Sequence, residues 1–379
     1  MVMNNKKTDK NKILSLFSHC KAAHIVLILS AVIIVLYFSL RGNEKIMDAV
    51  CLGFVRPYQR IVGTICSYVP FSVAELIYAA LIIWAVCYIV RAVYRIITRE
   101  SKLLCLYKTI ITLLAAVCGF YAGFCLLWGV YYTSAGFMED NGIETREYSV
   151  DELSSVTQYF AELANEYSDK VTRNGDGGFD VPLDEIFDAA PGLYQNVSEQ
   201  FPSLKWPEMR AKPFFTSKLL SLINFTGFFF PFTAEANINI DSPSCLIPST
   251  IAHELAHQRG VASEDEANFV GILASLESGN ETYIYSASLL AYIHLGNALY
   301  KADNNAWSDV FHSLSANVRE DLKSNNEYWD RFETKISDAS DAVYTGFLES
   351  YGEERGLKSY GACIDLLISY YLKEAESIK

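Results

Sequence analysis

Three long apolar runs occupy the first third of the chain. They cover residues 22–40, 73–90 and 110–130, and each is close to the ~20 residues that an α-helix needs to cross a bilayer. The first run is longer and bulkier than the core of a cleavable signal peptide, and further apolar runs follow it, so we interpret it as an uncleaved anchor. The pattern predicts three transmembrane helices.

The segment between the first two runs, residues 41–71, has a mixed character. It contains an amphipathic stretch at about residues 46–62. Such a stretch could lie along the membrane surface, with its apolar side in the lipid. A helix that packs on the later part of the chain explains the same pattern equally well, and both interpretations stay open here.

The remainder of the chain, residues 131–379, has the composition of a globular domain and mostly helical periodicity. Apolar positions recur at helical spacing over residues 150–171, and a second helix is predicted over 183–201 with a break near Pro191. We therefore expect a mainly α (α+β) protein, with a membrane domain over 1–130 and a mostly helical domain with a small β element over 131–379. Further helices are predicted over 267–278, 282–301, 307–315, 318–323, 329–348 and 359–377.

The β element is predicted at residues 233–241, where apolar and polar side chains alternate. This period is typical of a strand with one buried face. The preceding stretch, 227–231, is very apolar and contains a proline. We interpret it as a buried loop in preference to a membrane-dipping edge or a pocket wall.

Composition adds a membrane partner and argues against nucleic acid. The chain has 379 residues, of which 51% are hydrophobic, and its net charge is −13. Such an apolar chain is expected to contact a lipid bilayer, whereas a phosphate backbone requires a basic surface. Cys245 and Cys363 are the two cysteines beyond residue 131, and they could form one disulfide or remain buried thiols.

The basic residues predict the orientation in the membrane. Lysines precede the first apolar run, and an Arg/Lys cluster lies between the second and third runs, over residues 91–108. Because basic loops stay in the cytoplasm, both regions are expected on that side. Three spans then place residues 131–379 outside the cytoplasm, in a multi-pass protein of the cell membrane.

The candidate chemistry is concentrated in the sequence His253-Glu254-Leu-Ala-His257. Residues four apart share a helix face, so His253 and His257 can present two imidazoles to one metal ion. Zinc favours such ligands and keeps a position for water in catalytic sites. Glu254, next to the first histidine, is the candidate general base. Pro248 marks the expected start of this helix.

A third ligand is expected just beyond Gly260, a residue that can adopt the positive φ that ends a helix. Glu264 is the predicted ligand, although it could instead only stabilise the start of the next helix. Glu266 forms a predicted capping box with Ser263 and is the substitute ligand. Asn268, one turn after Glu264, is expected to orient a ligand.

The run His253-Glu-Leu-Ala-His257 followed by Glu264-Asp-Glu-Ala-Asn268 resembles the gluzincin metallopeptidases, in particular their membrane-bound members. Those families usually have Asp where this chain has Asn268. The resemblance implies Zn²⁺ as the cofactor and a peptide substrate, bound along a strand near the metal helix. In this chain that strand carries Glu235, Asn237 and Asn239. The full length also resembles a family of bacterial three-pass membrane proteins of unknown function.

Hydrolysis also requires a donor that stabilises the developing oxyanion. Tyr344, Tyr351 and Tyr360 are candidates, and we select Tyr360 because nearby glycines could turn it inward. His294 and His312 each stand alone on their helices and are interpreted as core or surface residues.

These features predict a membrane-anchored, zinc-dependent metallopeptidase. Two alternatives remain. The chain could be a non-catalytic membrane sensor or scaffold with a structural or vestigial zinc site, or it could be a zinc amidase that acts on a cell-wall substrate.

Overall fold

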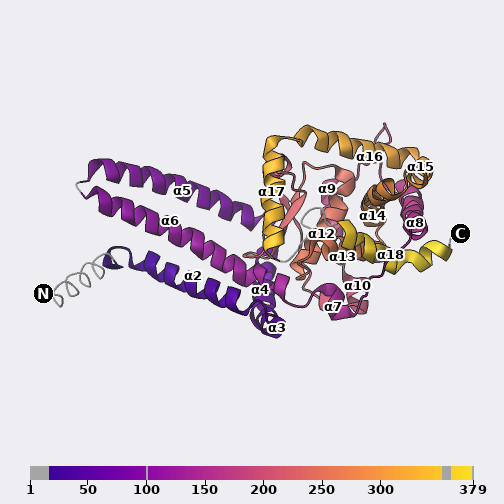
Figure 1. Ribbon diagram of the computed structural model, residues 1–379. Coiled ribbons are helices and arrows are strands. Elements are labelled where there is room, and N and C mark those ends of the chain that lie inside the picture. Colours follow the sequence, from indigo (N-terminus) through magenta and orange to yellow (C-terminus); the bar gives the residue numbers. More distant parts are fainter. Residues whose placement is uncertain (1–16, 100, 352–359, 378–379) are drawn as a thin grey trace. The chain divides into compact units, whose positions relative to one another are not determined.

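The computed structural model describes residues 17–99, 101–351 and 360–377, and it is predominantly helical with one small sheet (Figure 1). The predicted mainly α fold with a small β element is confirmed. Contacts divide the chain into two compact units. One contains Met1–Val55 and Ala74–Ser134, and the other contains Arg56–Val73 and Ala135–Lys379.

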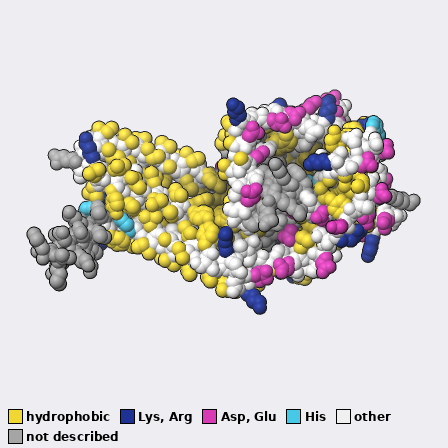
Figure 2. All heavy atoms as spheres, in the orientation of Figure 1, with side chains coloured by type: hydrophobic (Ala, Val, Ile, Leu, Met, Phe, Trp, Pro, Cys, Tyr) yellow, Lys and Arg dark blue, Asp and Glu magenta, His cyan; other side chains and the backbone are white. Residues whose placement is uncertain are grey.

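The first unit holds the three predicted spans, which are helices long and apolar enough to cross a bilayer. They are α2 (Lys21–Leu40), α5 (Val73–Thr98) and α6 (Lys102–Phe124), the last continued by the π-helical turn η2 (Cys125–Gly129). Hydrophobic side chains cover these helices in Figure 2. The chain is therefore a multi-pass membrane protein. Helices α5 and α6 extend beyond the apolar runs because the Arg and Lys residues there are good helix formers.

The segment between the first two spans forms three consecutive helical pieces, α3 (Glu44–Val50), η1 (Cys51–Val55) and α4 (Arg56–Ser67). Helix α4 belongs to the second unit, so it fits the open interpretation of a helix packed on the later part of the chain. The Arg56 guanidinium donates to the Ser203 carbonyl at 2.8 Å, and the Tyr58 hydroxyl donates to the Phe232 carbonyl at 2.9 Å. Two spans, α5 and α6, separate residues 41–72 from the region after α6, so the two regions lie on the same side of the membrane. The hydrogen bonds between α4 and residues 203 and 232 require this arrangement.

The second unit is mostly helical, in the order that the periodicity predicts. Helix α8 begins with a capping box, in which Ser149 accepts from the Glu152 backbone and the Glu152 carboxylate accepts from the Ser149 backbone. The predicted helix over 183–201 is broken near Pro191, as expected, into α9 and α10. The α-helices are α7 (Phe137–Asn141), α8 (Val150–Ser168), α9 (Leu183–Ala189), α10 (Gln195–Gln200), α11 (Ser217–Leu222), α12 (Ile247–Gln258), α13 (Glu264–Glu277), α14 (Glu281–Ala302), α15 (Asn304–Ser313), α16 (Ala316–Trp329), α17 (Lys335–Ser350) and α18 (Tyr360–Ser377).

Helix α14 lies at the centre of this unit, in contact with α8, α12, α13, α15 and α18. Its Tyr283 and Tyr285 are among the largest fully buried side chains, together with Phe160 of α8 and Phe269 of α13. Cys245 and Cys363 lie in the same core as free, buried thiols, so the alternative of a disulfide between them is not realised. This core fixes α12 and α13, the two helices that carry the candidate chemistry.

A three-stranded sheet lies beside α12, in the order β1-β3-β2. Strand β1 (Lys212–Phe214) is parallel to β3 (Glu235–Asn239), and β2 (Gly227–Phe230) is antiparallel to it. Two predictions are corrected here. Residues 227–230 form a strand, whereas we expected a buried loop. Strand β3 is buried on both faces, whereas we expected one exposed face, because Ala236 and Ile238 join the core while Glu235, Asn237 and Asn239 face other parts of the second unit.

A buried ion pair gives a test of this packing. Asp321 accepts from Arg173 at 2.9 Å and from the Phe179 backbone at 2.9 Å, and the Tyr285 hydroxyl also donates to it. Asp321→Ala leaves these donors buried without an acceptor, so we expect it to lower the free energy of unfolding by about 3–5 kcal/mol. Chemical denaturation of the full chain in detergent micelles measures this change.

Lys323→Ala is the matched control on the same helix. Lys323 pairs with Glu320 and Glu327 at the surface, where ion pairs contribute less than about 1 kcal/mol. If Asp321→Ala destabilises the chain no more than Lys323→Ala does, the buried network does not hold α16 to the core.

Candidate metal centre

Helix α12 directs one face into the core and the opposite face toward α13. Pro248 lies in its first turn, as predicted, where a missing N–H costs nothing. Ile251 and Leu255 are buried in the core. His253 and His257 lie together on the other face, with ring centroids 4.6 Å apart and ring planes perpendicular.

The turn after α12 fixes the orientation of His257. Gly260 has φ +93°, and its N–H donates to the His257 carbonyl while Val261 N–H donates to the Ala256 carbonyl, which is a Schellman motif. The Val261 carbonyl then accepts from His257 Nδ1 at 2.7 Å. With its proton on Nδ1, a neutral His257 would carry its lone pair on Nε2, the atom that faces Glu264.

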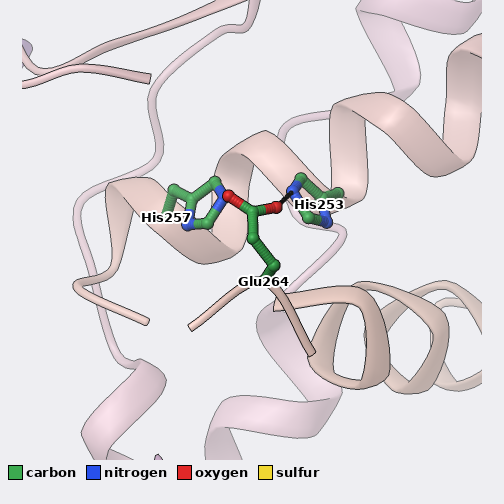
Figure 3. A group of neighbouring side chains, drawn as sticks. All are labelled: His253, His257 and Glu264. Carbon is green, nitrogen blue, oxygen red and sulfur yellow. Dashed lines mark ion pairs between the residues drawn. The ribbon is translucent and has the colours of Figure 1, made fainter. Parts of the chain in front are cut away.

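Glu264 is the first residue of α13, and its carboxylate lies between the two imidazoles (Figure 3). Oε2 is 3.2 Å from His253 Nε2, and Oε1 is 3.6 Å from His257 Nε2. The candidate ligand atoms of these three residues all lie within 4.8 Å of one another. The structure therefore brings together the three side chains that the sequence proposes as metal ligands.

Gly271 sets the distance between the two helices, and the sequence analysis missed it. A Cβ atom at this position would lie 2.9 Å from the His253 backbone nitrogen and 3.2 Å from its Cα. Only glycine lets α13 approach α12 this closely, and the approach delivers Glu264 to the histidines. A glycine inside an otherwise good helix is the signal that could have identified this contact.

Glu254 is buried beside strand β2. A Cβ atom on Gly227 would lie 2.8 Å from Glu254 Oε1, so Gly227 provides the space for this carboxyl group. Among the described residues, Glu254 Oε2 has no hydrogen-bond partner. Burial raises the pKa of Glu254 to about 7, against the opposing effect of the positive charges on His253 and His257. A carboxyl group with this pKa can both accept and release a proton near neutral pH.

The carboxylate and the two imidazoles shift one another's pKa values. Burial alone would lower the pKa of His257, but the Glu264 carboxylate raises it to about 9. Burial would likewise raise the pKa of Glu264, but His257 and His253 hold it well below its ordinary value. A carboxylate held between two imidazoles supplies the His₂Glu donor set of catalytic zinc sites, so these residues fit a zinc ion.

Glu266 does not fit the two roles predicted for it. Its carboxylate accepts from the Phe137 backbone at 3.0 Å and from the Met138 backbone at 2.9 Å, and it therefore caps α7. Ser263 makes no side-chain cap, so the predicted capping box is wrong. The prediction of Glu266 as a substitute ligand is wrong as well, because its carboxylate already accepts hydrogen bonds from backbone N–H groups in the first turn of α7.

Tyr344, not Asn268, forms a hydrogen bond with Glu264, the candidate third ligand. Among the described residues, Asn268 forms no hydrogen bond with His253, His257 or Glu264, so its predicted orienting role is not seen. The Tyr344 hydroxyl of α17 donates to Glu264 Oε1 at 2.5 Å. Tyr360, the selected oxyanion donor, starts α18, but its side chain lies outside the described residues.

The residues predicted to bind substrate are structural. Asn237 accepts from Ser72 at 2.6 Å, Glu235 accepts from the Val73 backbone at 3.1 Å, and the Asn239 amide donates to the Phe225 carbonyl. All three are buried. Their strand, β3, is paired on both sides, so the prediction that it binds an extended peptide is wrong. The edge strand beside Glu254 is β2.

The remaining histidines lie outside the cluster, as predicted. His294 is buried on α14, and burial together with the charge of His253 lowers its pKa to about 4, so it stays neutral. His312 is exposed on α15 and bonds to the Ser308 carbonyl of its own helix.

The fold and the site define a multi-pass membrane protein whose helical unit carries a His₂Glu cluster with an adjacent buried glutamate. The chain belongs to the family described as "Protein of unknown function (DUF3810)", whose sequence model matches residues 52–368. That range includes α4, two of the spans and both helices of the cluster. No curated protein and no solved structure matches the chain.

The close contact at Gly271 predicts a change in metal binding. In Gly271→Ala, the added methyl group must push α13 away from His253, and Glu264 moves with it. We expect the affinity of the full chain for zinc to fall by about 10–100-fold, the usual effect of disturbing the groups that position a ligand. Competition with a chelator measures the dissociation constant.

Gly296→Ala is the matched control. Its added Cβ would lie 3.5 Å from the Tyr292 ring, an ordinary contact, and both variants gain similar helix propensity. Equal zinc affinity in the two variants would show that the α12–α13 distance does not set the geometry of the cluster.

Proposed function

We propose that this protein is a membrane-anchored, zinc-dependent metallopeptidase. The observation that carries the proposal is that the candidate ligand atoms of His253, His257 and Glu264 lie within 4.8 Å of one another. The carboxyl group of Glu254, on the same helix as the two histidines, is buried next to them. Nε2 of each histidine and the Glu264 carboxylate would hold the ion. When bound, zinc supplies a Lewis acid that polarises a carbonyl group and increases the acidity of a water molecule.

Glu254 is the proposed general base. It takes a proton from the attacking water and later gives that proton to the amine that leaves when the peptide bond breaks. Burial raises the pKa of this carboxyl group, which makes it a better proton acceptor than an exposed glutamate. Because its Oε2 has no hydrogen-bond partner among the described residues, this oxygen is available to a water molecule.

Other residues of the chain hold the ligands in position. The Val261 carbonyl keeps the proton of His257 on Nδ1, which leaves Nε2 to bind the ion. The Tyr344 hydroxyl orients Glu264 from the other side of the cluster. Both partners restrict rotation of side chains that must meet at one point, and such restriction is needed for a site of defined geometry.

Strand β2 is the proposed binding surface for the peptide. It lies at the edge of the described sheet, and its Gly227 contacts Glu254. An edge strand can add an extended chain through backbone hydrogen bonds. The proposal agrees with the resemblance to gluzincins, in which a strand near the metal helix binds substrate.

The competing proposal is a non-catalytic sensor or scaffold with a structural or vestigial zinc site. Structural zinc sites usually have four protein ligands, whereas the cluster contains three among the described residues. A vestigial site would also be free to lose Glu254, which this chain keeps, buried next to His253. Both observations favour the enzyme.

We also propose that the second unit is extracytoplasmic and that the N-terminus is cytoplasmic. Arg91 and Arg95 lie near the end of α5, Arg99 follows it, and Lys102 and Lys108 lie near the start of α6. The positive-inside rule places this cluster in the cytoplasm. The second unit is joined to the opposite ends of the same two helices.

Glu254→Gln separates the catalytic proposal from the scaffold. The amide keeps the shape of the side chain but cannot accept the proton, so we expect zinc content to persist while cleavage of a library of fluorogenic extended peptides falls by about 10²–10⁴-fold. Glu281→Gln is the control, because Glu281 is exposed in the first turn of α14. Cleavage at the wild-type rate by Glu254→Gln would refute the assigned base, and wild-type protein that binds zinc but cleaves no peptide would favour the scaffold.

A pair of C-terminal fusions tests the orientation. Alkaline phosphatase becomes active only where its disulfides form, and green fluorescent protein fluoresces in the cytoplasm. In a bacterial host we expect an active phosphatase fusion and a dark fluorescent fusion. The reverse pattern would place the second unit in the cytoplasm.

A further inference from the structure

Helix α4 buries its small and polar side chains and exposes its apolar ones. Gln59, Gly63 and Cys66 are buried. Ile61 and Ile65, one turn apart on the opposite face, are each 62% exposed. Tyr68, just beyond the end of the helix on the same side, is 84% exposed. This distribution is the reverse of that expected for a helix packed on a domain in water.

Close contacts prevent α4 from rotating to bury this face. A Cβ atom on Gly63 would lie 2.6 Å from Met209 Sδ and 3.1 Å from Ala234 Cβ. The guanidinium groups of Arg56 and Arg60 lie over the Trp206 ring, at 5.0 and 4.7 Å from its centroid. The isoleucines are therefore held outward by the packing on the opposite side of the helix.

The exposed apolar side chains lead directly into a membrane span. Phe71 is 51% exposed, and helix α5 begins at Val73. Two residues of chain reach at most about 7 Å, so Phe71 must lie at the membrane surface if α5 crosses the bilayer. The adjoining residues are anchored in the second unit, because Ser72 donates to Asn237 and the Val73 N–H donates to Glu235.

We propose that the outward face of α4, formed by Pro57, Ile61, Ile65 and Tyr68 and continued by Phe71, rests in the headgroup region of the lipid bilayer. We name this surface the α4 apolar face. A bilayer is the occupant because the face continues into a transmembrane helix, and because isolated isoleucines and aromatic residues next to arginines are typical of helices that lie in the interface. This docking does not depend on the proposed peptidase activity.

Photo-crosslinking tests the proposal in the full chain. p-Benzoylphenylalanine replaces Ile61 or Ile65, and the chain is reconstituted in nanodiscs of phosphatidylethanolamine and phosphatidylglycerol. After irradiation, mass spectrometry detects phospholipid adducts. The control position is Tyr300, which is 54% exposed on α14 of the same unit. We expect adducts at positions 61 and 65 at a yield several-fold above that at position 300.

Adduct yields equal to that at position 300 would overturn the proposal. Crosslinks to a second copy of the chain, in place of lipid, would also overturn it and would assign the α4 apolar face to a dimer. Tyr68 is a second labelling site, because benzoylphenylalanine replaces a tyrosine with little change in shape. It keeps the test decisive if the variants at 61 and 65 do not show the wild-type melting transition.

Discussion

The contact between α12 and α13 at Gly271 is the constraint on which the candidate site depends. The backbone of α13 touches the backbone of His253, so the two helices are closer than side chains larger than hydrogen would allow. The first residue of α13, Glu264, then meets both histidines of α12. The core stabilises this contact, because α14 packs against both α12 and α13. Tyr283 and Tyr285 of α14 are fully buried there. A metal site built in this way derives its geometry from helix packing, and the loop between the helices only has to connect them.

The second unit is assembled from two parts of the chain that are separated by α5 and α6. Residues 56–73 precede these two spans, and residues 135–379 follow them. The joint between the parts is polar and buried. Strand β3 supplies Glu235 and Asn237 to the segment at residues 72–73, and Lys212 of β1 donates to the Val69 carbonyl. Side chains to which the gluzincin resemblance assigned substrate binding therefore hold the start of a membrane span. The family match begins at residue 52, so it includes both parts of this unit.

The parts of the site that are local in sequence could be predicted, and the parts made by distant segments could not. His253 and His257 are one turn apart, and Glu264 follows after a single turn of the chain, so spacing alone brought them together. Glu266 was misassigned because its partner, the first turn of α7, is more than a hundred residues away. The pattern of β3 predicted a strand but not its neighbours, because alternation does not distinguish a central strand covered by protein on both faces from one that is open to solvent. Tyr344 was one of three candidate oxyanion donors, of which Tyr360 was selected, and only tertiary structure shows that α17 brings Tyr344 to Glu264.

The connection between α12 and α13 consists of residues 259–263, and its length matters more than most of its side chains. A deletion there would leave too little chain to reach from His257 to Glu264, and an insertion would loosen the first turn of α13 next to the imidazoles, while the rest of α13 stays packed at Gly271. Gly260 and the Val261 carbonyl are tied to His257 at the other end of the same connection. Relatives that keep this chemistry should therefore tolerate an exchange at the partly exposed position 263 far better than any change in the number of residues between His257 and Glu264.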